Sequence, residues 1–314
     1  MRVLFWGTPE FAAPTFRALL GEGYDVVGVV TQPDRPRGRH RSVPVAPPVK
    51  HIALEEDITV LQPERPRGAA FLASLRALEP DVSVVVAYGH ILPGDVIHLP
   101  PLGTLNVHAS LLPRWRGAAP IQAAILNGDA ESGVSIMRMV ERLDAGPVLL
   151  QAPTPILEDE TFGELHLRLS ELGALAIIEA LALVSLGGAP EQAQDESRAS
   201  YAPKIQRDTT RVDWDADARR VARVIRAFDP RPGAHTTLRD AEIKLFGARP
   251  VTDAEGDPGV VLDIDESGML VACGQGAVRI GYAQPEGRRR LAALDWKQGR
   301  GIALGDRFDG SASA

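Results

Sequence analysis

Short apolar runs alternate with helix-like segments over the first 150 residues, and this alternation restricts the possible folds more than any other feature. The runs at 2–7 (RVLFWG) and 25–31 (DVVGVVT) are continuously apolar, as expected of strands buried on both faces. The segment between them, 9–23, has helical spacing and ends in glycine. Further apolar runs follow at 80–89, 103–109 and 132–140. This rhythm predicts an α/β domain with a Rossmann-like, mostly parallel sheet covered by helices.

The pattern changes in the second half of the chain. A long helix is expected over about 161–186, because Thr161 and Glu164 form a capping-box pattern at its start. Residues 187–200 are small and polar without apolar periodicity, which is typical of a linker. A helix at 213–228 and short β-rich runs between turns follow, a composition that suits a small OB-like β-barrel. The expected parts are an α/β domain at 1–186, a linker at 187–206 and a C-terminal β-barrel domain at 207–314.

The cysteine count and the distribution of charge narrow the possible environments and partners. The single cysteine, Cys273, excludes an intramolecular disulfide and a cysteine-based zinc cluster. No apolar run approaches the ~20 residues of a membrane span and no signal peptide is visible, so a soluble cytoplasmic protein is expected. Residues 1–205 hold 17 basic and 24 acidic side chains, whereas residues 206–314 hold 17 of each. The net charge of −7 therefore does not exclude a nucleic-acid partner, for which local basic clusters matter more.

The first turn after a strand does not have the sequence of a dinucleotide-binding turn. Such a turn needs G-x-G-x-x-G, whose glycines admit a pyrophosphate close to the backbone. Here Gly7 stands alone, and Glu10 places an acidic group at the helix start, where it competes with a phosphate. The sequence therefore disfavours a nicotinamide cofactor.

An amide and an imidazole stand two residues apart in the run LNVHASLLPRWRGAAP. If the run begins as a strand, Asn106 and His108 point to one face near its carboxyl end, where open α/β sheets bind ligands. This pair suits an oxygen that gains negative charge beside a group that carries a proton. A buried pair tied into backbone hydrogen bonds fits the residues equally well.

Asp144, in the segment ERLDAGPV, follows another predicted strand and is a candidate partner for His108. A carboxylate there would orient the imidazole or accept a proton through water, whereas a purely turn-forming aspartate is the more common case. The chain has no G-x-S-x-G elbow and no H-E-x-x-H ligand pair. The sequence thus predicts a site without a nucleophile and without a metal.

These segments together resemble the methionyl-tRNA formyltransferases, in the same order and spacing along nearly the whole chain. The matching segments are TPEFAAPTF, TQPDRPRGR, VVVAYGHILP, NVHASLLPRWRGAAPIQAAILNGD, GVSIMRMVERLDAGPVL, YAPKI, VDW, IRAFDPRPGA and PGVVL. The central segment is highly specific, and the later ones are less so. The resemblance implies transfer of a formyl group from 10-formyltetrahydrofolate to the α-amine of methionyl initiator tRNA.

The resemblance also implies roles for particular residues. Asn106, His108 and Asp144 match the catalytic residues of the family. The segment Ser110-Leu111-Leu112-Pro113 matches its folate-contacting wall. Residues of the loop beside the pterin pocket are Tyr88, Gly89, Ile91 and Leu92. No metal is expected among the cofactors.

Two basic groups are candidates for tRNA contact. One is a loop with arginines at 35, 37, 39 and 41, where the resemblance implies an insertion that engages the tRNA acceptor end; composition alone favours a solvated loop. The other is a helical stripe of Arg219, Arg223 and Arg226, with Arg220 beside it, which equally fits a solvated face. In the central segment, Arg114 and Arg116 are candidates to face phosphate or carboxylate groups, and an ordinary surface position fits each of them equally well.

Departures from the family pattern and rival functions remain to be tested. Asp229 and Arg231 stand where an asparagine and a tryptophan are usual, which puts details of tRNA contact in doubt. His90 and Ala109 are milder departures.

Rival functions are a sugar-nucleotide or small-amine formyltransferase, a formyltetrahydrofolate hydrolase and a non-catalytic RNA-binding module. Nothing in the sequence indicates an obligate oligomer, so a monomer is expected.

Overall fold

The computed structural model describes residues 1–36 and 44–309, and its contacts divide the chain into two compact units. The first unit comprises residues 1–117, 132–154 and 166–201. The second comprises residues 118–131 and 155–165 together with the chain from 202 onward. Each unit is therefore assembled from separate stretches of sequence, unlike the expected division into 1–186, 187–206 and 207–314.

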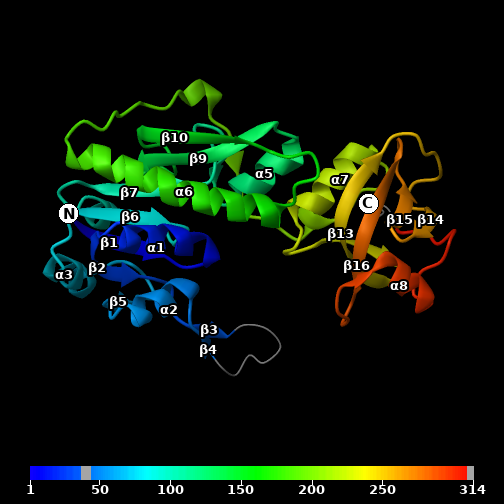
Figure 1. The fold of residues 1–314 in the computed structure, drawn as a ribbon, viewed down its shortest axis with the longest axis horizontal. Helices are drawn as coiled ribbons and strands as arrows, with labels where there is room; N and C mark the ends of the chain where they lie inside the picture. The colour runs from blue at the N-terminus through cyan, green and yellow to red at the C-terminus, as the bar shows by residue number, and fades with distance from the viewer. Residues whose placement is uncertain (37–43, 310–314) are drawn as a thin grey trace. The chain divides into compact units, whose positions relative to one another are not determined.

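The first unit is built on a seven-stranded sheet with the order β10-β9-β7-β6-β1-β2-β5 (Figure 1). Its pairs from β5 through β7 are parallel, whereas β7 and β9 are antiparallel. This confirms the expected Rossmann-like, mostly parallel sheet. The strands are β1 (Arg2–Gly7), β2 (Asp25–Val30), β5 (Val60–Leu61), β6 (Val82–Val86), β7 (Thr104–His108), β9 (Glu131–Arg138) and β10 (Val148–Pro155).

The helices that accompany this sheet begin and end with the expected signals. Thr161 and Glu164 cap α6 reciprocally: the Glu164 carboxylate accepts from the Thr161 backbone N–H at 2.9 Å, and the Thr161 hydroxyl accepts from the Glu164 N–H at 3.3 Å. Gly173 lets α6 approach the sheet, because an added Cβ would lie 2.8 Å from Val107 of β7. The helices are α1 (Ala13–Gly21), α2 (Pro48–Glu55), α3 (Ala69–Ala77), α4 (Gly94–Ile97) and α6 (Phe162–Ser185), with a 3₁₀ turn η1 (Glu10–Ala12).

Two short two-stranded ribbons accompany the main sheet, and the first of them is antiparallel. β3 (Arg35–Pro36) pairs with β4 (Pro44–Val45) on either side of residues 37–43. β8 (Arg116–Gly117) pairs with β11 (Tyr201–Ala202), after the 3₁₀ turn η2 (Glu196–Arg198). The segment expected to be a linker is therefore ordered along this part of the chain.

The second unit is antiparallel and rich in strands, as expected of its composition. Its sheet has the order β12-β13-β16-β15-β14, with β17 on β16. The segment 305–309 pairs with residues 259–261 beside β14 and with Thr237 of β12, so it bridges the two edges. The elements are β12 (Ala234–Leu238), β13 (Ala241–Val251), β14 (Val261–Asp265), β15 (Gly268–Ala272), β16 (Ala277–Pro285), β17 (Leu291–Ala292), α5 (Pro120–Asn127), α7 (Ala218–Ala227), α8 (Ala293–Gln298) and η3 (Asp208–Thr210).

Aromatic packing in the second unit explains why α7 is shorter than the helix expected at 213–228. Trp214 is buried, stacks on Phe308 at 5.5 Å and donates its indole N–H to Thr236. Asp217 then caps α7 by accepting from the Arg220 N–H at 3.0 Å. The residues before Asp217 therefore enter the core as a turn. No described helix has the length and apolar character needed to cross a membrane.

Asp229, one of the departures noted above, lies inside the second unit. Its carboxylate pairs with the Arg290 guanidinium at 3.1 Å and accepts from the backbone N–H of Gly247 at 2.8 Å. That guanidinium lies over the rings of Phe246, at 4.2 Å, and Tyr282, at 4.6 Å. The added charge at position 229 is thus matched by a cation within the same unit.

We expect Asp229→Ala to lower the free energy of unfolding by about 2–4 kcal/mol, because it removes one partner of a largely buried ion pair and an acceptor for a backbone N–H. This expected loss of stability is at the low end of the range for buried ion pairs, because the Arg290 side chain is partly exposed. Urea unfolding followed by circular dichroism measures the change. Asp229→Asn is the matched control, since it keeps an acceptor for Gly247 and should cost less. An unchanged unfolding midpoint in the alanine variant would contradict this assignment.

Candidate active site

The carboxyl end of β7 places an amide and an imidazole in the interior of the first unit's sheet. Asn106 pairs in register with Val85 of β6 and with Met137 of β9, and His108 pairs with Ser135 of β9. The His108 side chain is 6% exposed, and Asn106 is half-buried. The two side chains share one face because they are two residues apart on a strand. The expected strand is present, and both residues lie towards its carboxyl end, as expected.

Both ring nitrogens of His108 face oxygen atoms. Nε2 lies 3.0 Å from the carbonyl oxygen of Trp115, and Nδ1 lies 3.6 Å from Oδ2 of Asp144. A carbonyl oxygen only accepts, so Nε2 carries a proton in this arrangement. Nδ1 faces the carboxylate at a distance longer than that of a hydrogen bond. The structure thus brings together His108 and Asp144, which lie 36 positions apart in the sequence.

A tight turn holds the Asp144 carboxylate. Oδ2 accepts from the backbone N–H of Gly117 at 2.8 Å, and the side chain is 13% exposed. The backbone at Asp144 has a φ of +48°, in the left-handed region that non-glycine residues rarely adopt. Two positions later, Gly146 lies so close to Arg138 that an added Cβ would overlap the carbonyl oxygen of that residue. The turn therefore admits little variation in where it presents the carboxylate.

Residues of the segment 191–201 support the turn at residues 144–146. The side-chain amide of Gln194 donates to the carbonyl oxygen of Asp144 at 2.8 Å and to that of Gly146 at 2.7 Å. Its oxygen accepts from Arg116, whose Nη2 lies at 2.8 Å and Nε at 3.1 Å. The sequence analysis missed Gln194, because a polar residue in an aperiodic segment gives no signal of this network.

Arg116 is fully buried, at 0% exposure, and faces a carboxylate, one of the two anionic groups anticipated for it. Its guanidinium pairs with Glu196 at 2.9 and 3.2 Å, and Arg142 reaches the same carboxylate at 2.9 Å. Hydrogen bonds from Arg116 and then Arg142 lower the pKa of Glu196 to about 2. A lowered carboxylate pKa adds stability that is present above the ordinary value of 4.5 and is lost as the pH falls towards 2. This ion pair therefore persists at neutral and mildly acidic pH.

The folate wall implied by the resemblance is held rigidly by two polar residues that were also missed. The hydroxyl of Ser135 donates to the carbonyl oxygen of Ser110 at 2.7 Å and accepts from the N–H of Leu112 at 3.0 Å. Gln151 donates to the Leu112 carbonyl oxygen at 2.9 Å. Ser110 and Leu112 are buried, whereas Leu111 and Pro113 are partly exposed. The two partly exposed residues are therefore the ones that offer an apolar surface.

The loop expected beside a pterin ring is divided between core and surface. Tyr88 and Leu92 are buried in the core of the first unit, and the Tyr88 ring packs edge-on against Trp6 at 5.2 Å. Burial raises the pKa of Tyr88 to about 12. Ile91 is 82% exposed, and Gly89 has a φ of +92°. The side chains of Tyr88 and Leu92 are thus turned into the core, whereas Ile91 and the backbone at Gly89 are accessible.

The basic loop is only partly within the described residues. Arg35 lies on β3 and is 3.9 Å from Glu64, whereas Arg37, Arg39 and Arg41 fall outside the described residues. Just before the loop, Asp34 pairs with Lys50 at 2.8 Å and accepts from Gln62 at 2.8 Å. These two contacts fix the start of the loop to α2 and to the residue after β5.

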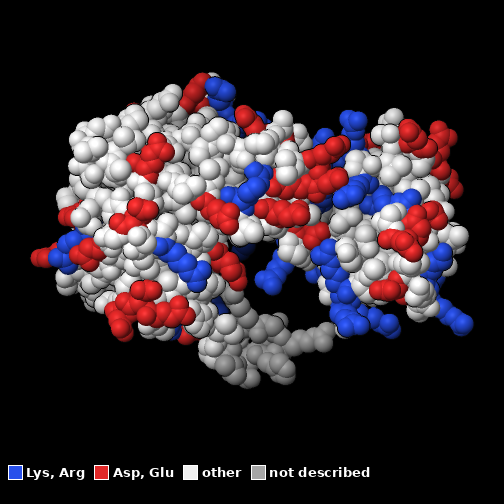
Figure 2. Space-filling view, in the orientation of Figure 1, with Lys and Arg blue, Asp and Glu red and all other residues white. Residues whose placement is uncertain are grey.

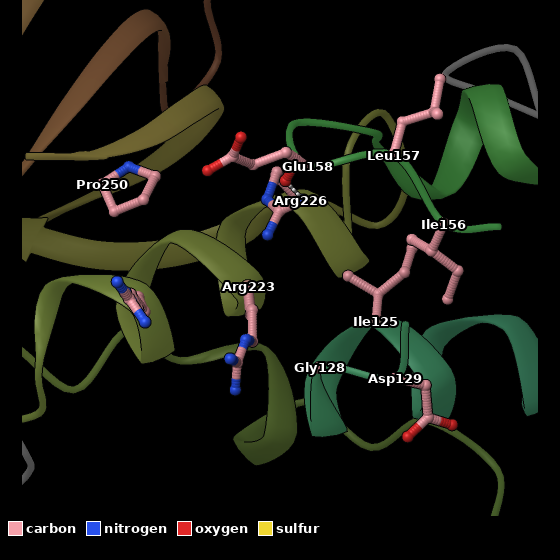
Figure 3. Close-up of a pocket in the computed structure, with 10 residues that line it drawn as sticks. Ile125, Gly128, Asp129, Ile156, Leu157, Glu158, Arg223, Arg226 and Pro250 are labelled. Atoms are coloured by element: carbon pink, nitrogen blue, oxygen red, sulfur yellow. Dashed lines mark hydrogen bonds between the residues drawn. The ribbon is translucent and has the colours of Figure 1, made fainter. Parts of the chain in front are cut away.

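The arginine stripe of α7 lines a cavity of about 280 Å³ in the second unit (Figure 3). Arg219 is exposed and Arg223 is half-buried, but Arg226 is 8% exposed and its Nη1 donates to the carbonyl oxygen of Glu158. Burial lowers the pKa of Arg226. The expectation of one continuous solvent-facing stripe is therefore wrong at Arg226, because the helix packs that position against residues 158–160. The remaining lining residues are Ile125, Gly128, Asp129, Ile156, Leu157 and Pro250.

Charges of both signs are interspersed on the viewed face of each unit (Figure 2). The Asp129 and Glu158 side chains occur among the arginines of the cavity, so even this basic region is mixed. Within residues 1–36 and 44–309, no group of three or more His, Cys, Asp or Glu side chains is placed to hold a metal ion. Cys273 is buried, and burial raises its pKa to about 12.

Comparisons with known proteins agree with both halves of the chain. Residues 1–181 match the family described as formyl transferase, and residues 204–301 match the formyl transferase C-terminal domain. A methionyl-tRNA formyltransferase of Pseudomonas syringae pv. tomato is 48% identical over 295 residues, which cover 94% of this chain and 93% of the relative. Another, from Aromatoleum aromaticum, is 48% identical over 312 residues, covering 99% and 98%.

Solved structures share the fold at low sequence identity. WlaRD, a sugar 3N-formyl transferase crystallised with dTDP and 5-N-formyl-THF, superposes with a TM-score of 0.68 at 17% identity. The match covers 92% of this chain and 99% of that one. At this identity the likeness concerns the arrangement of strands and helices alone.

Proposed function

Because this chain belongs to the methionyl-tRNA formyltransferases, we propose that the site at the end of β7 transfers a formyl group from 10-formyltetrahydrofolate to the α-amine of methionyl initiator tRNA. The protein is a folate-dependent formyl transferase by family, and the roles of single residues are our proposal. The observation that supports them best is the alignment of His108 between Trp115 and Asp144 at the sheet edge.

The proposed reaction needs no covalent enzyme intermediate. The free amine attacks the formyl carbon, and negative charge develops on the formyl oxygen as the tetrahedral intermediate forms. Asn106 and His108 stabilise this oxyanion by donating hydrogen bonds. The amine proton then moves to the leaving N10 of the folate, which departs as tetrahydrofolate. Asp144 keeps His108 protonated and assists this proton movement.

The hydrogen bond from His108 to Trp115 sets a condition on this mechanism. Nδ1 faces Asp144, so Nε2–H is the ring donor available to the substrate. Donation to the oxyanion therefore requires this N–H to change its acceptor from the Trp115 carbonyl oxygen to the formyl oxygen. The folate itself would lie along Leu111 and Pro113, with Ile91 and the backbone around Gly89 on the other side.

An acid-gel assay tests the acceptor. Methionyl initiator tRNA and 10-formyltetrahydrofolate should yield formyl-methionyl-tRNA at a rate far above that of formyl-donor hydrolysis. A parallel reaction with a dTDP-amino sugar as the acceptor tests the rival sugar-nucleotide formyltransferase. A reaction with water as the only acceptor tests the rival hydrolase. Faster formylation of the sugar nucleotide, or hydrolysis without formyl-methionyl-tRNA, would overturn the proposed acceptor.

We also propose that tRNA contacts the basic loop at Arg35, Arg37, Arg39 and Arg41 and the exposed part of the α7 stripe. Arg219 and Arg223 carry positive charge into the cavity region of the second unit, where a phosphate could displace water. Arg226 is left out of this proposal because its guanidinium is occupied by backbone carbonyl groups.

Replacing Arg219 and Arg223 together with glutamine should raise the KM for tRNA and reduce the salt dependence of kcat/KM. Each lost phosphate contact removes roughly one unit from the slope against log salt, through counterion release. The KM for the formyl donor should stay unchanged. The matched control is Arg17→Gln with Arg76→Gln, two exposed arginines on α1 and α3. An unaltered slope in the α7 double variant would remove this region from the tRNA path.

The protein's location and state of assembly complete the proposal. We infer that it works as a monomer in the cytoplasm, where initiator tRNA and reduced folate are both present. Light scattering coupled to size-exclusion chromatography should give a mass near 33.7 kDa. A stable mass of twice that value would contradict the monomer.

A further inference from the structure

We propose that Gln194 is a positioning residue for the reaction, holding the Asp144 turn so that its carboxylate meets His108. This inference rests on the proposed function and extends it to the segment 191–201. The hydrogen bonds of Gln194 go to the carbonyl oxygens of Asp144 and Gly146 and come from the guanidinium of Arg116, and not to the imidazole or the carboxylate. It would therefore act through the turn.

The side-chain amide of Gln194 is matched to its surroundings at both ends. Its NH₂ group has two hydrogens and meets two carbonyl oxygens, at 2.8 and 2.7 Å. Its oxygen accepts two hydrogen bonds from one guanidinium, at 3.1 and 2.8 Å. A primary amide can donate twice and accept twice, whereas a carboxylate only accepts and a thioether only accepts weakly. Glutamine is thus chemically specified at this position.

Arg116 makes this contact immobile. The guanidinium has no exposed surface and is fixed on its other side by two oxygens of Glu196. Its backbone N–H donates to the carbonyl oxygen of Ser200 at 2.9 Å. Gln194 is therefore held between a buried cation and the turn, and a shift of its amide would leave that cation short of acceptors.

The same segment also sets the other partner of His108. The hydroxyl of Ser200 accepts from the N–H of Trp115 at 3.0 Å, and the carbonyl oxygen of Trp115 receives Nε2–H of His108. Trp115, like Asp144, has a positive φ, of +59°. Both residues that face the imidazole thus occupy a left-handed backbone conformation, which persists only where the surroundings enforce it. Residues 194 and 200 supply that enforcement.

Gln194→Met tests the proposal, because methionine has a similar length and cannot reproduce the amide. We expect kcat to fall about 10- to 100-fold, since a displacement of about 1 Å at a reacting group can cost about 100-fold. The KM values for tRNA and for 10-formyltetrahydrofolate should change less than about threefold. The matched control is Gln192→Met in the same segment, where the backbone pairs with Val148 and the side chain is exposed. It should retain the parental kcat.

A double-mutant cycle separates positioning from general damage. If Gln194 acts through Asp144, then Gln194→Met should cost less than about twofold when added to Asp144→Asn. Losses that multiply in full would overturn the proposal, because they would show that Gln194 acts independently of the carboxylate. A loss confined to KM would overturn it as well.

Gln194→Glu guards against a folding defect in the methionine variant. Glutamate keeps the acceptors for Arg116 but loses both donors to the turn, so it should fold and still lose kcat. A parental kcat in this variant would sink the role of Gln194. If, in contrast, His108→Ala and Asp144→Asn are themselves fully active, the proposed catalytic residues are wrong. A defective Asp144→Asn beside a normal Gln194→Glu would overturn only the present inference.

Discussion

Replacing His108 with alanine should lower the turnover of formyl transfer at least about 100-fold while folate binding stays nearly intact. The imidazole is the group proposed to stabilise the oxyanion and to carry the proton, and each such contribution is typically worth about 10²-fold or more. Folate binding should survive because the hydrogen bonds by which Ser135 and Gln151 hold the wall at residues 110–113 do not use the His108 imidazole. Single-turnover formylation at saturating tRNA, beside a folate titration, measures the two effects separately.

A histidine from the second unit provides the control for this variant. His235 also uses a ring nitrogen in a hydrogen bond, with the Thr210 hydroxyl at 3.0 Å. His235→Ala should keep turnover at saturating tRNA, which would show that loss of an imidazole is not harmful by itself. Near-parental turnover in His108→Ala would mean that this imidazole is only structural and that the proposed mechanism is wrong.

Asp144→Asn should reduce turnover by about 100-fold or more, through loss of charge with little change in shape. Asparagine can still accept the hydrogen bond from the Gly117 N–H, so the turn should keep its conformation. A neutral amide, however, cannot stabilise an imidazolium or take up a proton. Rates measured over a range of pH with both substrates saturating test this expectation.

Asp81→Asn is the corresponding control for the carboxylate. Asp81 also accepts from a backbone N–H, that of Arg2 at 2.6 Å, but it precedes β6 at the amino end of the strand. Asp81→Asn removes one negative charge at the amino ends of the strands, away from the proposed site at their carboxyl ends. It should leave turnover unchanged. Wild-type activity in Asp144→Asn throughout the pH range would remove that carboxylate from the site.

The sequence predicted the parts of the molecule that have a periodic or local signal. The parallel sheet followed from continuous apolar runs, and the start of α6 followed from the Thr161 capping box. Asn106 and His108 could be placed on one strand face because strand side chains alternate. Asp144 was a candidate partner for His108 because it follows a predicted strand, but only the family resemblance favoured that role over a turn-forming aspartate.

The parts that could not be predicted depend on contacts between a side chain and distant backbone. Gln194 lies in a segment with no apolar pattern, and its partners are carbonyl oxygens 48 and 50 positions away. For Arg116 the sequence left a phosphate, a carboxylate or a surface position open, and burial against Glu196 is uncommon for a charged side chain. Tyr88 matched a ligand-binding loop, but its ring is needed in the core. Local sequence does not tell whether such a side chain contacts a ligand or is buried in the protein, because that depends on which distant element packs against it.

The second unit is built from three separate stretches of sequence, so it cannot be exchanged by a single cut between the two halves of the chain. α5 and residues 155–165, which end within the first turn of the long helix α6, belong to the same unit as α7 and the C-terminal strands, and α5 packs on α7. Arg220, for example, donates to the carbonyl oxygen of Leu126 at 2.7 Å. A recombination event at one point near residue 200 would give a hybrid whose α7 meets a foreign α5. A working hybrid would therefore need an α5 surface that fits the new α7, including an acceptor for Arg220.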